Sequence, residues 1–477
     1  MPEPMEERLT PLSGLDAIFL YLESAGTPMH VGSVMLIELP DREARRRHNY
    51  DFHQALAAHI QARLPHAPAL RRVLREAPLD LGHPMWSEAE SVDLKKHIRK
   101  RKLPGTGGRA KLMALVGKLH SQMLSRELPM WQFVVIENVE PGIVALYCKI
   151  HHALLDGQGG VALARALLDT EAKPRRPGKA PSTARNTGVR LRKRDLARSA
   201  TRSSIQQLGK FLRTLPAALK LAGNTIETLG LLRENLSLAP RTIFNRQIGA
   251  ERSFAAVSLP IEQIKQVAQG FKVSVNDVVM AICSGALRAL LEKVHELPDQ
   301  PLIAAMPVSL REAGDQAANN QVSMVQCSLA TDIADPVRRL RAIHAATGRI
   351  KRRLAMHKNL IPTDFPGFAA PLWASGLVRL WSSGRIAERL PPLANVAISN
   401  VPGPPVALYM AGARVRHYYP VSIVTHGLAF NITVQSYAGH LEFGLTACKD
   451  VVARPDIVAK AMAAALEELH QQIAHEA

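Results

Sequence analysis

The residues best suited to chemistry lie in one short segment, His151-His152-Ala153-Leu154-Leu155-Asp156-Gly157. A histidine can take a proton from a hydroxyl group near neutral pH, because its ordinary pKa is about 6.5. Asp156 and Gly157 can fold back in a tight turn, since glycine adopts backbone conformations closed to other residues. Asp156 could then orient an imidazole ring or form an ion pair with a distant arginine. The segment therefore predicts general-base catalysis by a histidine.

Three other chemistries fit the chain less well. Cys148 precedes His151 by three residues, but no second His or Cys cluster stands at metal-ligand spacing, so we expect no metal site. A nucleophilic serine is disfavoured because no GxSxG segment occurs, and Ser284-Gly285 lies in an apolar, helix-like run. Residues 105–110 match the GxGxxA pattern of a dinucleotide-binding loop, but they follow a basic run instead of an expected strand.

The motif needs a rigid support, and the sequence around it predicts one. Residues 143–150 are an apolar, β-branched run that predicts a strand ending at the motif, and 161–168 predicts a helix after it. Strand ends suit catalytic groups, because the sheet holds them while the loop leaves them accessible. Further strands are expected at 31–39 and 133–136, and a helix at 52–64.

The second half of the chain repeats this mixture. The expected strands are 253–259, 302–308, 393–398, 430–436 and 441–448, and the expected helices are 261–269, 278–294 and one from Pro455 onward. The predicted fold class is therefore α/β (α+β), with two lobes that each contain a mixed sheet flanked by helices.

Charge divides the chain further. Its 477 residues include 60 Lys and Arg against 41 Asp and Glu, a formal net charge of +19, and 47% are hydrophobic, which excludes wholesale disorder. Residues 95–111 hold eight basic residues and no acid, and 171–213 hold thirteen basic residues and two acids, so the rest is neutral. We expect lobes at 1–170 and 241–477, joined by a basic, partly helical linker at 171–240.

The basic segments predict either a polyanionic partner or merely a solvated surface. Nucleic acid is disfavoured, because strand binding needs aromatic residues among the charges. Residues 95–111 contain none, and 171–213 contain only Phe211. An amphipathic pattern from Ile205 fits packing on the protein itself better than a membrane-surface helix. Anionic lipid headgroups and a phosphate-rich substrate remain as candidate partners.

The compartment follows from cysteine usage and the N-terminus. The four cysteines are far apart and form no CxxC pair, which fits a reducing compartment. The first ten residues, MPEPMEERLT, lack the apolar core of a secretory signal. No run reaches about 18 uninterrupted apolar residues, the length that a transmembrane helix needs. We expect a cytoplasmic protein, peripheral to the inner face of the membrane.

The motif and six further segments resemble one enzyme superfamily. HHALLDG matches the HHxxxDG motif of CoA-dependent acyltransferases, which include chloramphenicol acetyltransferase and peptide-synthetase condensation domains. The other segments, in order along nearly the whole chain, resemble the bacterial wax ester synthase/diacylglycerol acyltransferase family. They are Leu12-Ser13-Gly14-Leu15-Asp16-Ala17, Met29-His30-Val31-Gly32, Pro129-Met130-Trp131, Val275-Asn276-Asp277-Val278-Val279, Ser399-Asn400-Val401-Pro402-Gly403-Pro404 and Ser436-Tyr437-Ala438-Gly439. Met130 replaces the leucine of the usual PLW triplet, a conservative change.

The resemblance implies two chloramphenicol-acetyltransferase-like lobes around a tunnel that holds His152. His152 would be the general base that deprotonates an alcohol, and the alkoxide would attack the acyl-CoA thioester with no covalent acyl-enzyme. His151 and Asp156 would support it, and Gly157 would permit the turn. Acyl-CoA would be a substrate, and neither a metal nor a prosthetic cofactor is implied.

The resemblance also makes six residues candidates for substrate binding or for structural roles: Pro129, Trp131, Asn276, Asp277, Asn400 and Gly403. Asn276 and Asp277 precede an apolar helix, so they fit a helix cap as well as a place in the pocket or in oxyanion stabilisation. The Pro-Gly-Pro run at Gly403 predicts a turn first, and by resemblance a loop that lines the tunnel.

The expected reaction is esterification of long-chain fatty alcohols, diacylglycerol or both, which gives wax esters or triacylglycerol. An anionic membrane or a lipid droplet surface is the expected peripheral partner. Two alternatives stay open at this stage: another HHxxxDG acyltransferase with a different acceptor, and a non-catalytic basic lipid-binding protein.

Overall fold

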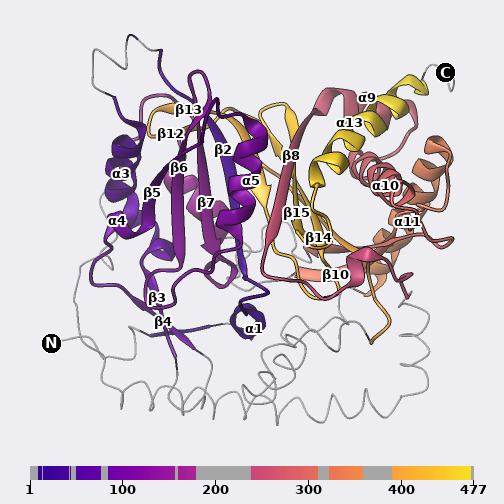
Figure 1. The fold of residues 1–477 in the computed structure, drawn as a ribbon, viewed down its shortest axis with the longest axis horizontal. Coiled ribbons are helices and arrows are strands. Elements are labelled where there is room, and N and C mark those ends of the chain that lie inside the picture. Colours follow the sequence, from indigo (N-terminus) through magenta and orange to yellow (C-terminus); the bar gives the residue numbers. More distant parts are fainter. Residues whose placement is uncertain are drawn as a thin grey trace.

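Two six-stranded sheets form two lobes, and helices cover their faces (Figure 1). This is the arrangement of the computed structural model, and it confirms the predicted fold class. The structure describes residues 9–12, 14–41, 43, 50–76, 84–155, 159–178, 238–309, 322–357 and 389–473. The helix pattern from Ile205 and most of the predicted linker lie outside these residues.

The motif strand, β7, lies inside the first sheet. It runs between β2 and β6, antiparallel to both, and all nine of its residues are buried. A strand buried on both faces reads as a continuous apolar run, which explains why the sequence predicts it well. The strand order is β12-β13-β2-β7-β6-β5. In that order the bounds are Tyr409–Met410, Ala413–Val421, His30–Glu38, Ile143–His151, Trp131–Glu140 and Ile98–Lys102.

Two strands of this first sheet come from far along the chain. β13 pairs antiparallel with β2, with Tyr419 opposite Val34, and β12 pairs with β13. The sequence does not predict β13, because its pattern of apolar positions is broken by a register shift between Val415 and His417. The division of the chain at residues 170 and 240 stays a prediction. Residues 409–421 lie beyond both boundaries in the sequence but belong to the sheet of the N-terminal lobe.

β5 is the edge strand of the first sheet and lies within the first basic segment. It pairs in parallel with β6, and the four residues from Arg99 to Lys102 are exposed. Charged side chains on an edge strand discourage pairing with another chain. They also remove the alternation of apolar and polar residues from which a strand is predicted. The expectation that residues 105–110 follow no strand is therefore wrong. Gly107 has φ +71°, and a Cβ there would lie 1.7 Å from the carbonyl oxygen of Asn138, so this loop requires glycine.

The second sheet has the strand order β10-β9-β11-β14-β15-β8. Its bounds in that order are Val322–Ser328, Ile303–Ser309, Val396–Val401, Phe430–Tyr437, His440–Cys448 and Arg252–Pro260. Four helices share a large apolar core with this sheet: α9 (Ile261–Gly270), α10 (Val275–Lys293), α11 (Pro336–His357) and α13 (Pro455–Gln471). Most expected elements of this half are present. The strand expected at 393–398 begins later, at Val396.

Helix α5 (Arg109–His120) joins the two lobes. It packs on the first sheet and also against β8 of the second (Figure 1). The approach is so close that a Cβ on Gly117 would lie 2.6 Å from the carbonyl oxygen of Arg252. A second close approach joins β15 to β13, where a Cβ on Gly444 would lie 1.7 Å from the carbonyl oxygen of Pro420.

The remaining elements pack around the first sheet. The helix expected at 52–64 is α3 (Phe52–Arg63), whose first turn is capped by the carboxylate of Asp51. The others are β1 (Thr10–Pro11), α1 (Gly14–Leu22), β3 (Arg72–Arg75), β4 (Met85–Glu88), α4 (Leu94–His97) and α6 (Gly159–Leu167). Among the described helices none alone is long and apolar enough to span a bilayer. α9 and α10 meet those criteria only as a pair bent by 103°.

Candidate active site

The histidine pair lies where β7 ends. His151 is the last residue of the strand, and His152 opens one 3-10 turn, η5 (His152–Leu154). The imidazole of His152 stacks on Phe19 of α1, with ring centroids 3.9 Å apart and an interplanar angle of 16°. The N–H of His152 donates to the carbonyl oxygen of Met29 at 2.9 Å. Helix α1 and the segment before β2 therefore fix both the ring and the backbone of His152.

His151 is completely buried behind His152. Its Nδ1 accepts a hydrogen bond of 3.1 Å from the N–H of Ala153, which places the proton of the neutral ring on Nε2. That Nε2 lies 3.3 Å from Oε1 of Glu23. His151 thus shapes the turn that presents His152, the bond from Ala153 to Nδ1 fixes its tautomer, and its Nε2 faces the Glu23 carboxylate.

The Glu23 carboxylate is itself held from two sides. Arg126 donates to Oε2 through Nε at 3.2 Å and Nη2 at 3.0 Å, and the N–H of Met29 donates to Oε1 at 3.3 Å. Burial raises the pKa of Glu23, but hydrogen bonds and charge from His151 and Arg126 outweigh it, so the net pKa lies below the ordinary value. The carboxylate is therefore ionised behind the histidine pair.

The protonation of His152 suits a base. Burial lowers its pKa to about 4, and the neighbouring His151 acts in the same direction. The ring is therefore neutral at pH 7 and able to accept a proton. Its Nδ1 is buried, which leaves Nε2 as the nitrogen that can meet a substrate.

The other two motif residues, Asp156 and Gly157, lie outside the described residues. Their expected supporting roles stay predictions. The carboxylate that the structure brings to the histidine pair belongs to Glu23, a residue that spacing within the motif cannot indicate. The family-like segment that begins at Leu12 could have pointed to Glu23. That segment leads into helix α1, and Glu23 is the first residue after the helix.

The triplet around Trp131 supports the site through the backbone. The N–H of His151 donates to the carbonyl oxygen of Met130 at 2.9 Å, and that of Trp131 to Pro129 at 2.8 Å. The indole of Trp131 is buried, donates to the carbonyl oxygen of Leu70 at 2.9 Å and stacks on the ring of His97. These contacts place Pro129 and Trp131 in the structural support of β7.

Asp277 serves its own helix. It forms a capping box with Ser274 at the start of α10, which confirms the expected cap. Its Oδ1 accepts from Thr347 Oγ1 at 2.6 Å, and its Oδ2 lies 2.8 Å from Nδ1 of His344, so it ties α10 to α11. Burial raises the pKa of Asp277, but the bonds from Thr347, His344 and Ser274 lower it to below its ordinary value.

The structure brings Asn276 and Asn400 together. Nδ2 of Asn400 donates to Oδ1 of Asn276 at 3.4 Å, which joins the end of β11 to the start of α10. The backbone of Gly403 lies against Ser436 of β14. Its N–H donates to Ser436 Oγ at 2.8 Å, and a Cβ there would lie 2.0 Å from the carbonyl oxygen of Ser436. Among the described residues, no hydrogen bond joins these groups to His152.

Metal chemistry finds no support in the described part of the chain, where no group of three or more His, Cys, Asp or Glu side chains converges. All four cysteines are buried and unpaired, and burial raises the pKa of Cys148 well above its ordinary range. The cysteine beside the motif is therefore an inert core residue.

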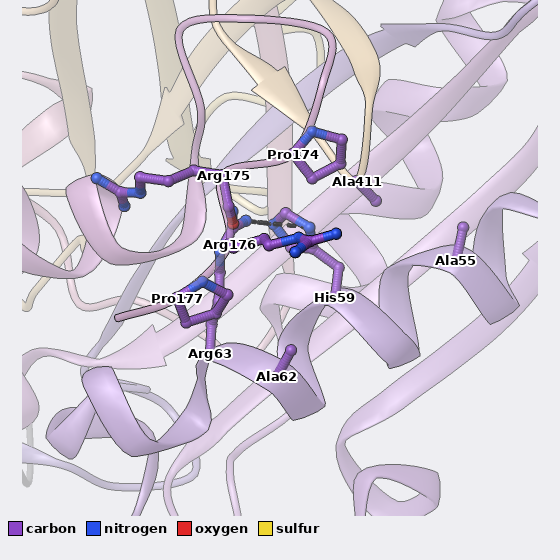
Figure 2. Close-up of a pocket in the computed structure, with 9 residues that line it drawn as sticks. All are labelled: Ala55, His59, Ala62, Arg63, Pro174, Arg175, Arg176, Pro177 and Ala411. Atoms are coloured by element: carbon purple, nitrogen blue, oxygen red, sulfur yellow. Dashed lines mark hydrogen bonds between the residues drawn. The ribbon is translucent and has the colours of Figure 1, made fainter. Parts of the chain in front are cut away.

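A surface pocket of about 290 Å³ lies elsewhere, between α3, residues 174–177 and the turn at Ala411 (Figure 2). None of its lining residues belongs to the motif. Arg63 at its base is buried and bound to Asp169, with 2.8 Å to each carboxylate oxygen. This ion pair ties α3 to the chain after α6, so the pocket is a by-product of packing and not the catalytic site.

Comparisons with known proteins agree with this geometry. A family model described as "Wax ester synthase/diacylglycerol acyltransferase catalytic domain" matches residues 12–279, and the corresponding C-terminal domain model matches 318–470. A Mycobacterium tuberculosis protein named "Putative diacyglycerol O-acyltransferase" is 37% identical over 97% of this chain and 100% of its own length. The chain belongs to the wax ester synthase/diacylglycerol acyltransferase family.

Solved structures extend the likeness. The wax ester synthase/diacylglycerol acyltransferase from Marinobacter aquaeolei VT8 is 30% identical, covers 98% of this chain and 100% of its own, and has a TM-score of 0.70. The first condensation domain of the CDA synthetase, 13% identical over 98% and 97% of the two chains with a TM-score of 0.56, shares the fold alone. As a member of the wax ester synthase/diacylglycerol acyltransferase family, this chain is an acyltransferase.

Proposed function

We propose that this acyltransferase esterifies a long-chain fatty alcohol, diacylglycerol or both with the acyl group of acyl-CoA, and that His152 is the general base. One observation carries the proposal. A neutral imidazole stands at the end of a buried strand, stacked on Phe19, with Nδ1 buried and Glu23 holding His151 behind it. General bases need this combination of fixed geometry and an unprotonated ring at working pH.

The steps need no other reactive side chain. Nε2 of His152 accepts the hydroxyl proton while the alcohol oxygen attacks the thioester carbon. The tetrahedral intermediate then collapses with loss of the C–S bond. The CoA thiolate accepts that proton from Nε2, so ester and free CoA leave and the imidazole is neutral again. No covalent acyl-enzyme forms, and no cofactor takes part.

The acceptor substrates of this reaction suit a site near a lipid surface. Fatty alcohols and diacylglycerol partition into membranes, and a basic surface raises the local concentration of enzyme at anionic headgroups. In the described part of the chain, exposed cations at Arg99, Arg101 and Lys102 have no acidic partner among the ion pairs, whereas Lys100 pairs with Asp51 and Glu137. We therefore place the enzyme at the inner face of the cytoplasmic membrane or at a lipid droplet.

The test follows the release of CoA thiol from palmitoyl-CoA, with hexadecanol, with a diacylglycerol and with no acceptor. We expect acceptor-dependent release by the wild type and a loss of about 100-fold or more in His152→Ala. The exposed His440→Ala is the matched control and should retain activity.

Each other outcome points elsewhere. Near-normal activity in His152→Ala contradicts the assignment of the base. Release only with an amine acceptor supports a different HHxxxDG acyltransferase, and vesicle binding with no thiol release at all supports a non-catalytic lipid-binding protein.

A further inference from the structure

Lys149 is buried in the strand that carries the motif. It lies two residues before His151 in β7, so both side chains leave the same face of the sheet. The residue is only 1% exposed. A buried ammonium group is costly unless its hydrogen bonds are made and its charge is balanced. Its partners therefore indicate why the chain keeps a lysine here.

The partners of Lys149 are one backbone carbonyl in the last turn of α5 and one just after that helix. Nζ donates to the oxygen of Leu119 at 3.0 Å and to that of Gln122 at 2.7 Å. The last carbonyls of a helix lack partners within the helix and carry its negative dipole end, so a buried cation suits them. Burial lowers the pKa of Lys149 to about 8, and the Glu23 carboxylate acts against that shift.

The segment that Lys149 holds leads to the histidine pair. Four residues after Gln122 comes Arg126, which binds the Glu23 carboxylate and also donates to the carbonyl oxygen of Leu20 at 2.9 Å. Residues 122–126 are thus anchored at one end by Lys149 and at the other by α1 and Glu23. His151 rests against that same carboxylate.

We propose that Lys149 is a positioning residue of the active site, which anchors residues 122–126 so that Arg126 holds Glu23 against His151 and the turn at His152 keeps its geometry. This inference rests on the proposed function, because it assigns the effect of Lys149 to the base His152. Lys149 itself touches no substrate.

The alternative role is support of α5 alone. In that case the loss of Lys149 lowers stability, and its effect on turnover is independent of Glu23. The two roles differ in a double-mutant cycle, because groups that act through one path are not additive, whereas independent groups are.

The experiment compares Lys149→Met, Glu23→Gln and the double variant. The control is Lys118→Met, which replaces an exposed residue of α5. Acceptor-dependent thiol release is measured well below each variant's thermal midpoint. We expect Lys149→Met and Glu23→Gln each to lower kcat by about 10-fold or more, with KM for palmitoyl-CoA within about twofold. The double variant should lie within about twofold of Glu23→Gln, and Lys118→Met should match the wild type.

Two results would overturn the inference: wild-type kcat in Lys149→Met, or a double variant whose loss is the product of the single losses. If Lys149→Met fails to fold, Lys149→Gln, which keeps N–H donors without the charge, enters the same cycle. His152→Ala keeps the two proposals apart. If it stays active, the proposed function fails, whereas an inactive His152→Ala with a normal Lys149→Met overturns only the role of Lys149.

Discussion

At the scale of single residues, the two histidines of the motif divide the work. His152 is stacked on Phe19 with a buried Nδ1, and His151 is enclosed between the Ala153 amide and the Glu23 carboxylate. Because the Ala153 N–H occupies Nδ1 of His151, that ring can donate only through Nε2, which is the atom next to Glu23. In the proposed mechanism, the Glu23 carboxylate would therefore act on His152 through the backbone of the turn.

The pH dependence of turnover follows from the environment of His152. Burial holds its pKa at about 4, so the base stays neutral until the pH falls to that value. We expect kcat/KM to be level around neutral pH and to fall as the pH drops through about 4. A pH profile of acceptor-dependent thiol release checks this. An acid limb near the ordinary histidine value of about 6.5 would contradict it.

Stability contributes to the same profile and must be measured beside it. The unfolded chain binds a proton at His152 below about 6.5, whereas the folded chain binds it only below about 4. Between these values the unfolded state holds more protons, so this group lowers the free energy of unfolding as the pH falls. Thermal midpoints across the range separate unfolding from titration of the base.

At the scale of elements, Asp277 at the start of α10 was a candidate for the substrate pocket, but its contacts stabilise helix packing. Asp277 caps its helix and joins it to α11, and both of its oxygens are engaged. We expect Asp277→Ala to lower the free energy of unfolding by about 1–3 kcal/mol and to change kcat and KM by less than about twofold in the folded protein. Chemical denaturation with parallel kinetics measures both.

The exposed Asp299→Ala provides the matched control, with little expected change in either quantity. Unchanged stability together with a raised KM in Asp277→Ala would instead assign this carboxylate to the substrate pocket.

The elements that the sequence predicted have a regular pattern of apolar residues, because each lies in a single kind of surroundings. β7 and α10 are apolar runs buried in a core, and α3 carries Leu56 and Ile60 at helical spacing on its buried side. Two of the strands that the sequence did not predict, β5 and β13, have mixed surroundings. β5 is a charged edge, and β13 belongs to the first sheet, approaches β15 of the second and has a register shift in its middle.

The candidate site divides in the same way. The motif histidines and the cap at Asp277 follow from local spacing. Glu23, Arg126 and Lys149 do not, because their partners lie 100 or more residues away or are backbone atoms of another element. Only the folded chain brings together Glu23 after α1, the cationic Arg126 after α5 and the end of β7.

At the scale of the whole molecule, a strand from the C-terminal part of the chain belongs to the sheet of the N-terminal lobe. β13 completes the first sheet beside β2, and Tyr419 and Val421 lie in the apolar core between that sheet and α5. A chain of residues 1–279, which includes the motif, lacks this strand and exposes the edge of β2. We expect that fragment to aggregate or to unfold without cooperativity, as judged by size-exclusion chromatography and circular dichroism beside the full chain. A monodisperse fragment with a cooperative transition would contradict this.

The basic segments act at the same scale. We expect replacement of the Lys and Arg residues of 173–213 by Gln to weaken cosedimentation with anionic vesicles more than turnover of soluble substrates, because headgroup attraction scales with the number of cations. Arg99, Arg101 and Lys102 of β5, replaced by Gln, form the matched comparison. Unchanged sedimentation in the 173–213 variant would leave that segment as a solvated linker.

The shared sheet also has a consequence for how the enzyme is made. β2, β6 and β7 are translated within the first 151 residues, but their sheet gains β13 only once residue 421 has left the ribosome. Domains generally fold as units during synthesis, from the N-terminus onward. Because this N-terminal sheet is incomplete until then, we expect the histidine pair to reach its working geometry late in translation. A nascent chain that carries the motif is therefore not yet an enzyme that could consume acyl-CoA.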